Sequence, residues 1–128
     1  MIHPRPPRIA AAGALLGTLL IWPCTQSIAD SQRQLTQGRA VFESRCLICH
    51  GARADGNSSL GKLMNPHPAN LTVSSLSARE RERIVRKGGA AVGRSSGMPA
   101  WEQELSAQEI SAVVAYVGTL RQANGVHR

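Results

Sequence analysis

The sequence predicts an all-α protein, and three observations support that fold class. Apolar residues recur every three or four positions in residues 31–46 and 107–122, which is the spacing of one face of a helix. A Ser-x-x-Glu capping pattern precedes residues 107–122, and the same pattern predicts a further helix over residues 78–87. Gly, Pro and Asn interrupt any period in residues 51–71 and 90–101. We therefore expect three helices joined by two long loops.

The first and third helices are expected to cross. Leu35, Gly38 and Phe42 share one side of the first helix. Glycine costs a helix about 1 kcal/mol relative to alanine, so Gly38 makes sense where another helix approaches closely. The third helix carries a continuous apolar face, formed by Ile110, Val113, Val114, Val117 and Leu120. We expect the crossing near Gly38 and Phe42, with Tyr116 beside it.

The second helix begins and ends at clear signals. Ser77 and Glu80 form its capping box, and Gly88 and Gly89 end it. Arginine and glutamate alternate over residues 79–83, and this charge run predicts a solvent-exposed face.

Cys46-Leu47-Ile48-Cys49-His50 is the most informative motif of the chain. Two thiols three positions apart can each add across a vinyl group of a porphyrin. His50 is then held where its imidazole can ligate the iron. The motif predicts one haem bound covalently through Cys46 and Cys49, with His50 as an iron ligand.

Other interpretations of this motif fit less well. A zinc site needs four ligands, and the remaining histidines, His67 and His127, do not form the usual second pair. A thioredoxin-like redox pair requires a strand–helix setting, and no strand pattern precedes Cys46.

The first residues are predicted to be an export signal. A basic start precedes an apolar run at residues 9–22, and the small residues of Ser27-Ile28-Ala29 follow. We expect residues 1–29 to be a cleaved signal peptide and residues 30–128 to form one domain in the periplasm. The alternative is an uncleaved membrane anchor, because the run is only slightly shorter than the roughly 20 residues that span a bilayer.

The chain is basic, with a formal net charge of +7. Such a charge favours acidic partners or anionic membrane surfaces, and it equally suits ordinary solubility. An exported protein without an aromatic and basic platform is not expected to bind nucleic acid.

The sixth iron ligand would decide what the haem does. A filled position favours electron transfer, whereas an open one binds gas or peroxide. The candidates are Met64, Met98, His67 and His127. Gly97 and Pro99 suit a loop that presents Met98, so spacing favours Met98 modestly, but the length of an extended chain does not exclude Met64.

Taken together, the motifs resemble a class I c-type cytochrome, the small bacterial monohaem type. The resemblance covers residues 34–121. It rests on the order of the helix residues, the haem motif, a proline-rich segment, the Met98 segment and the last helix: Gly38 and Phe42, Cys46 to Gly51, Pro66 to Leu71, Gly97 to Trp101, and Val113 with Tyr116. His67 and Asn70 depart from the usual Pro and Asp of that group.

This resemblance implies a small cytochrome c fold, with three main helices and loops wrapped around one covalent haem c. It also implies that Cys46 and Cys49 bind the haem, that His50 and Met98 ligate its iron, and that Trp101 packs near it. No catalytic residue and no small-molecule substrate are expected.

The expected function is that of an exported, monomeric one-electron carrier between larger redox proteins, membrane-bound ones included. Two alternatives remain: an electron-entry haem subunit of a fixed oxidoreductase complex, and a haem enzyme or sensor whose distal methionine is displaceable.

Overall fold

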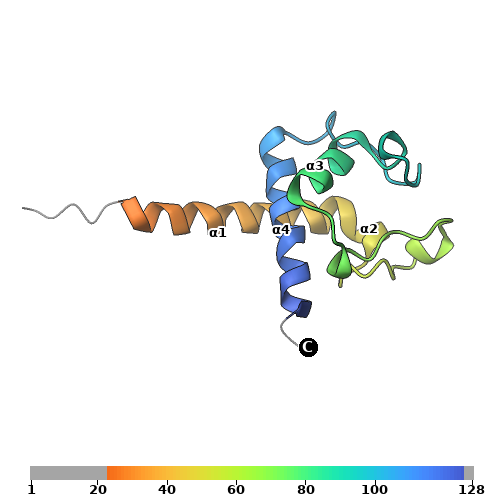
Figure 1. The fold of residues 1–128 in the computed structure, drawn as a ribbon, viewed down its shortest axis with the longest axis horizontal. Helices are drawn as coiled ribbons and strands as arrows, with labels where there is room; N and C mark the ends of the chain where they lie inside the picture. The colour runs from red at the N-terminus through yellow and green to blue at the C-terminus, as the bar shows by residue number, and fades with distance from the viewer. Residues whose placement is uncertain (1–22, 126–128) are drawn as a thin grey trace, which may run out of the picture.

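The protein is all-α over residues 23–125, the part that this computed structural model describes (Figure 1). Within that range there is no strand. The α-helices are α1 (Pro23–Val41), the short α2 (Leu47–His50), α3 (Ala78–Lys87) and α4 (Ala107–Gly125). The predicted fold class is therefore confirmed, and α3 has the bounds that its capping box and glycine stop predicted.

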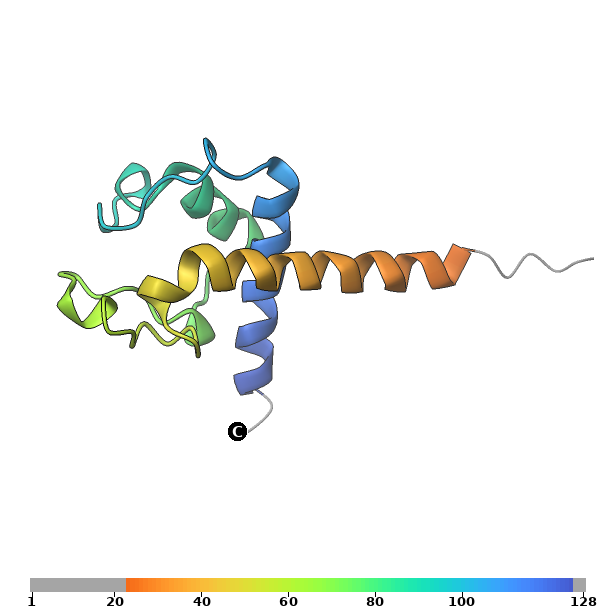
Figure 2. The ribbon, with the colours of Figure 1, turned by 180° about the vertical axis from the view of Figure 1, so that it is seen from behind.

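Helical backbone runs on from α1 through a π-helical turn, Phe42–Cys46, into α2. The predicted first helix, residues 31–46, was too short at both ends. Side chains 27–34 are exposed, and the start of α1 projects from the rest of the fold (Figure 2). The helix extends into this part without packing contacts because adding residues to an existing helix costs little. The predicted cleavage after Ala29 falls in this projecting part, and residues 1–22 lie outside the described range.

The predicted crossing of the first and last helices is confirmed as the contact between α1 and α4 (Figures 1 and 2). A Cβ at Gly38 would fall on the carbonyl oxygen of Ala112 and 2.9 Å from the Cβ of Tyr116, so the two backbones nearly touch. The rings of Phe42 and Tyr116 lie 5.6 Å apart in a tilted arrangement.

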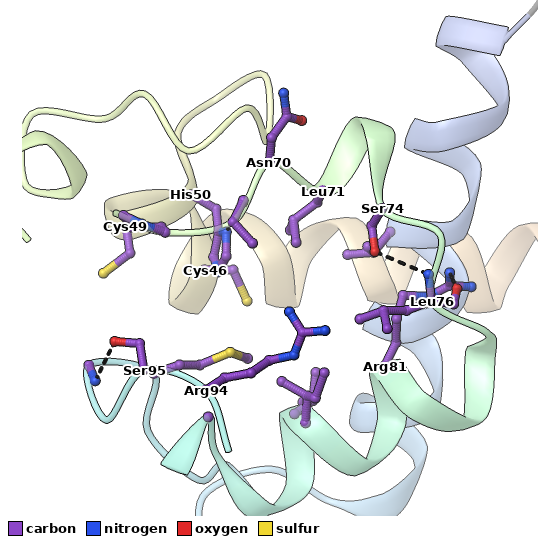
Figure 3. Close-up of a pocket in the computed structure, with 18 of the residues that line it drawn as sticks. Cys46, Cys49, His50, Asn70, Leu71, Ser74, Leu76, Arg81, Arg94 and Ser95 are labelled. Atoms are coloured by element: carbon purple, nitrogen blue, oxygen red, sulfur yellow. Dashed lines mark hydrogen bonds between the residues drawn. The ribbon is translucent and has the colours of Figure 1, made fainter. Parts of the chain in front are cut away.

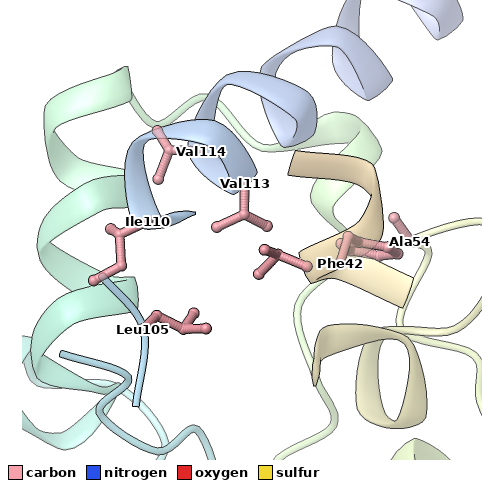
Figure 4. Packing of buried hydrophobic residues seen from close by; sticks show 7 residues of the cluster. Phe42, Ala54, Leu105, Ile110, Val113 and Val114 are labelled. Carbon is pink, nitrogen blue, oxygen red and sulfur yellow. The ribbon is translucent and has the colours of Figure 1, made fainter. Parts of the chain in front are cut away.

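The hydrophobic core sits at this crossing and beside it (Figure 4). It joins the end of α1, the π-helical turn that follows, the loop after α2, the segment just before α4 and the first half of α4. Its buried members are Val41, Phe42, Ala54, Leu105, Ile110, Val113 and Val114. The core is small, and its largest fully buried side chains are Ile110 and Val113. This small core braces the helices on one side of a large cavity.

Helix α4 begins at its predicted capping box, in which the Ser106 N–H donates to Glu109 Oε2 at 2.8 Å and the Glu109 N–H donates to Ser106 Oγ at 3.2 Å. It continues to Gly125, three residues beyond the predicted end at residue 122. The reason is that no glycine or proline stands between residues 119 and 124. His127 lies outside the described residues.

Two long loops connect the helices, as predicted, and both contain short 3₁₀ turns. The first holds η2 (Gly61–Leu63) and runs into η3 (Leu71–Val73). The second opens with η4 (Ala90–Val92). Both loops lie on the same side of α4 (Figures 1 and 2), and their side chains form walls of the cavity.

Candidate functional site

A cavity of about 830 Å³ lies between the two loops. Its walls come from the end of α1, the turn that carries the cysteines, α3, α4 and both loops, and most of the exposed wall surface is apolar. A space of this size is in the range of small-molecule and cofactor sites. The cavity brings together the predicted site residues Cys46, Cys49, His50 and Met98.

The sulfurs of Cys46 and Cys49 point to the same side, toward the space between the loops (Figure 3). Both thiols are free, as covalent attachment requires. Burial, and secondarily the neighbouring Cys49, raises the pKa of the Cys46 thiol to about 11. The Cys46 sulfur is therefore neutral at pH 7 and compatible with an apolar wall.

His50 is oriented by the first loop. Its Nδ1 lies 3.0 Å from the carbonyl oxygen of Ala69. A carbonyl only accepts, so Nδ1 carries the hydrogen, and Nε2 of the neutral ring keeps a free lone pair. Burial lowers the pKa of His50, while this hydrogen bond raises it. Ala69 belongs to the proline-rich segment Pro66 to Leu71 of the first loop.

Met98 is held on the opposite loop by the end of α3. The Gly89 N–H donates to the Met98 carbonyl at 3.0 Å, and the Trp101 N–H donates to the Val85 carbonyl at 3.0 Å. A Cβ at Gly88 would lie 2.9 Å from the Met98 carbonyl oxygen, and one at Gly89 would overlap the Ser95 carbonyl. The two glycines, predicted only as a helix stop, also allow the Met98 loop to pack closely.

The other candidate ligands fall in different places. Met64 also lines the cavity, and its Cε lies 2.6 Å from the position that a Cβ on Gly97 would take. Proximity alone therefore does not separate Met64 from Met98. His67 lies two residues before Ala69, which places it in the segment that holds His50, and its Nδ1 contacts the Gly61 carbonyl at 3.0 Å.

Asn70 stabilises the segment that carries the Ala69 carbonyl. Its Oδ1 accepts hydrogen bonds from the N–H of Thr72 at 2.9 Å and from the Thr72 hydroxyl at 2.7 Å, which caps η3. Ala54 adds a second anchor, because its carbonyl accepts the Leu71 N–H at 2.8 Å. The amide thus fills a capping role open to either Asn or Asp.

Arg81 is the site residue that sequence reasoning missed. The run at residues 79–83 was predicted to be solvent-exposed, but Arg81 is half-buried and lines the cavity. The available signal was its spacing, since Arg81 stands three and four residues before Ile84 and Val85, which are on the inner face.

These residues fit a haem. Two cysteine sulfurs, an imidazole whose Nδ1 is already hydrogen-bonded, and the thioethers of Met64 on the first loop and Met98 on the second line one apolar cavity. The zinc interpretation lacks its donors, because no three His, Cys, Asp or Glu side chains converge within the described part of the chain.

Comparison with known proteins decides the family. The family described as "Cytochrome C oxidase, cbb3-type, subunit III" matches residues 33–117. The chain belongs to this family. It is a monohaem cytochrome c domain with covalent haem c on Cys46 and Cys49. Such a domain is an electron carrier and not an enzyme, which confirms the predicted fold, cofactor and general role.

Individual relatives are similar to this cytochrome c over most of its length. The cbb3-type cytochrome c oxidase subunit FixP of Azorhizobium caulinodans is 31% identical over 116 residues, 81% of this chain and 37% of that protein. Subunit CcoP of Azospirillum brasilense is 29% identical over 84 residues, 66% of this chain and 28% of that protein. Cytochrome c6 of Bryopsis maxima is 34% identical over 80 residues, 62% of this chain and 84% of that protein. This chain thus spans about a third of the oxidase subunits that it matches.

The helices give one further result. Between residues 23 and 125, none combines the length and the apolar character that a membrane span requires.

Proposed function

We propose that this cytochrome c is an exported one-electron carrier whose haem iron is ligated by His50 and Met98. The supporting observation is that both residues line a single cavity and are held there by hydrogen bonds: the ring of His50, at the end of α2, by the Ala69 carbonyl, and the backbone of Met98, on the second loop, by the Gly89 N–H. When bound, haem supplies a one-electron Fe(III)/Fe(II) couple.

The work of the protein is to hold both ligands still. The Ala69 carbonyl fixes the ring of His50 and makes its Nε2 more basic. The contact of Gly89 with the Met98 carbonyl fixes the opposite loop. Two ligands that stay in place in both oxidation states keep rearrangement small, which suits fast electron transfer. A thioether ligand also favours a higher potential than two imidazoles.

We further propose that the carrier acts in the periplasm, as a monomer, after cleavage between Ala29 and Asp30. All side chains from 27 to 34 are exposed, so cleavage removes no buried contact there. Redox proteins, including membrane-bound ones, are its proposed partners. Their contacts would be small and short-lived, as in other electron-transfer encounters.

A second candidate is a haem subunit that passes electrons into a fixed oxidoreductase complex. The similarity to cbb3-type oxidase subunits favours it. The chemistry of the haem site is the same in both candidates, and only the lifetime of the association differs. Purification of the native protein in mild detergent separates them, because a subunit stays with its complex and a free carrier elutes alone.

The carrier function is tested by exposing the reduced holoprotein to carbon monoxide at neutral pH. Two fixed ligands leave no iron position open, so we expect an unchanged visible spectrum together with reversible one-electron titration at an electrode. Rapid formation of a carbon monoxide adduct would contradict the proposal and would support the gas-binding or enzymatic alternative.

A further inference from the structure

Two arginines that line the cavity form no ion pair within residues 23–125. Three guanidinium groups line the cavity, those of Arg45, Arg81 and Arg94, and no Asp or Glu lines it within the described residues. Arg45 approaches Glu104 at 4.0 Å. Neither Arg81 nor Arg94 forms an ion pair with any residue that the structure describes.

Arg81 is the more constrained of the two. Its Nη1 donates to the Leu76 carbonyl at 2.6 Å, and its Nη2 lies 3.2 Å from the position that a Cβ on Gly118 would take. Its Nε is buried and has no hydrogen-bond partner. A buried donor on a charged group is costly to leave unpaired, and an anion in the cavity beside the guanidinium would offset part of that cost through its charge.

Arg94 reaches the same region from the second loop. Its side chain extends across the space toward the end where Ser74, Leu76 and Arg81 lie (Figure 3). The pKa of Glu80 is lowered mainly by hydrogen bonds from the hydroxyl and the N–H of Ser77, and the charge of Arg94 adds a smaller lowering. The Glu80 carboxylate accepts both the N–H and the hydroxyl of Ser77, at 2.8 and 2.7 Å, and within the described residues it forms no ion pair with Arg94.

The place of these arginines matches the shape of the cofactor. The two propionates of a haem lie on the porphyrin edge opposite the two vinyl groups. Cys46 and Cys49 fix the vinyl edge near one end of the cavity, and Arg81 and Ser74 lie toward the other end (Figure 3). Resting on the proposed carrier function, we infer that Arg81 and Arg94 bind the two haem propionates and, through this charge pairing, raise the reduction potential.

Planar guanidinium groups suit this task, because they bind carboxylates with two parallel hydrogen bonds. A positive charge beside the propionates also opposes the extra positive charge of the oxidised iron. Its removal is therefore expected to favour Fe(III).

The test compares Arg81→Gln and Arg94→Gln holoproteins with Arg83→Gln, which removes the same charge from an exposed position of α3. At the midpoint potential of the unmodified protein, we expect the ratio of oxidised to reduced haem to rise about tenfold in each test variant, which is 59 mV for one electron. Resonance Raman bands of the propionates should shift in the same two variants. Arg83→Gln should change neither readout.

Arg94→Gln keeps the test decisive if Arg81→Gln does not fold, because Arg94 is exposed and its one hydrogen bond among the described residues is made by its backbone N–H, which glutamine retains. Potentials and propionate bands equal to those of Arg83→Gln would overturn the inference. That result differs from failure of the carrier function, which would appear as carbon monoxide binding by the unmodified protein.

Discussion

Replacement of Gly38 by alanine tests whether the crossing of α1 and α4 holds the fold together. The new Cβ would overlap the Ala112 carbonyl oxygen, 2.5 Å from the carbonyl carbon and 2.9 Å from the Cβ of Tyr116. Carbon atoms pack at about 3.5–4.0 Å, so the helices would have to separate by about 1 Å. All three atoms belong to the body of α4, and no side-chain rotation can move them away.

The expected loss follows from two opposing effects. Overpacking costs about 1–3 kcal/mol, and a clash with backbone belongs at the upper end of that range. Alanine returns about 1 kcal/mol through its better helix propensity. The free energy of unfolding should therefore fall by about 2 kcal/mol, which lowers the melting temperature of a domain this small by about 10 °C.

Chemical denaturation of the oxidised holoprotein, followed by far-ultraviolet circular dichroism, measures this loss. Ala40→Gly is the matched control, because residue 40 is exposed on the same helix and reports helix propensity alone, at about 1 kcal/mol. A Gly38→Ala protein as stable as the unmodified one would refute the close approach of the two helices.

Three further predictions concern the site and the caps. Gly89→Ala places a Cβ on the Ser95 carbonyl; it should displace the Met98 loop and allow the reduced protein to bind carbon monoxide, and continued refusal of the gas would count against that role of Gly89. Ser106→Ala should cost about 1 kcal/mol at pH 7 in denaturant titrations. Hydrogen bonds from the N–H and then the hydroxyl of Ser106 lower the pKa of Glu109. The part of the cap that uses this carboxylate is therefore fully present above the ordinary carboxyl pKa of 4.5 and is lost as the pH falls through the lowered value, whereas the bond from the Glu109 N–H to Ser106 Oγ does not titrate. The deficit should accordingly be smaller in strong acid, and an equal deficit there would contradict this role of the carboxylate. Replacement of both haem-attaching cysteines by serine should leave an unfolded or degraded chain, and a stable apoprotein by circular dichroism would show that the small core suffices.

Local signals predicted the local structure well. The capping boxes at Ser77 and Ser106 depend on residues three positions apart, and both form as predicted. The haem motif is equally local, since its five residues make one turn. Gly38 predicted a long-range contact correctly, because glycine weakens the middle of a helix and this cost is offset where a second backbone passes close by.

The parts that sequence did not predict depend on contacts between distant segments. No local pattern distinguishes the Ala69 carbonyl from its neighbours as the partner of His50, 19 residues away. The sequence shows Gly89 only as part of a helix stop. Its contact with the Met98 loop joins segments that are separate in the sequence, so no local pattern indicates it. Arg81 stood in a charged run, and its burial follows from which side of α3 faces the cavity.

The most direct test of the account is the identity of the second iron ligand. Oxidised haem with a methionine ligand has a weak far-red band in which charge moves from sulfur to iron. We predict this band in the purified holoprotein and in Met64→Ala, and its loss in Met98→Ala. A Met98→Ala protein that kept the band, beside a Met64→Ala protein that lost it, would contradict the account and assign the ligand to Met64.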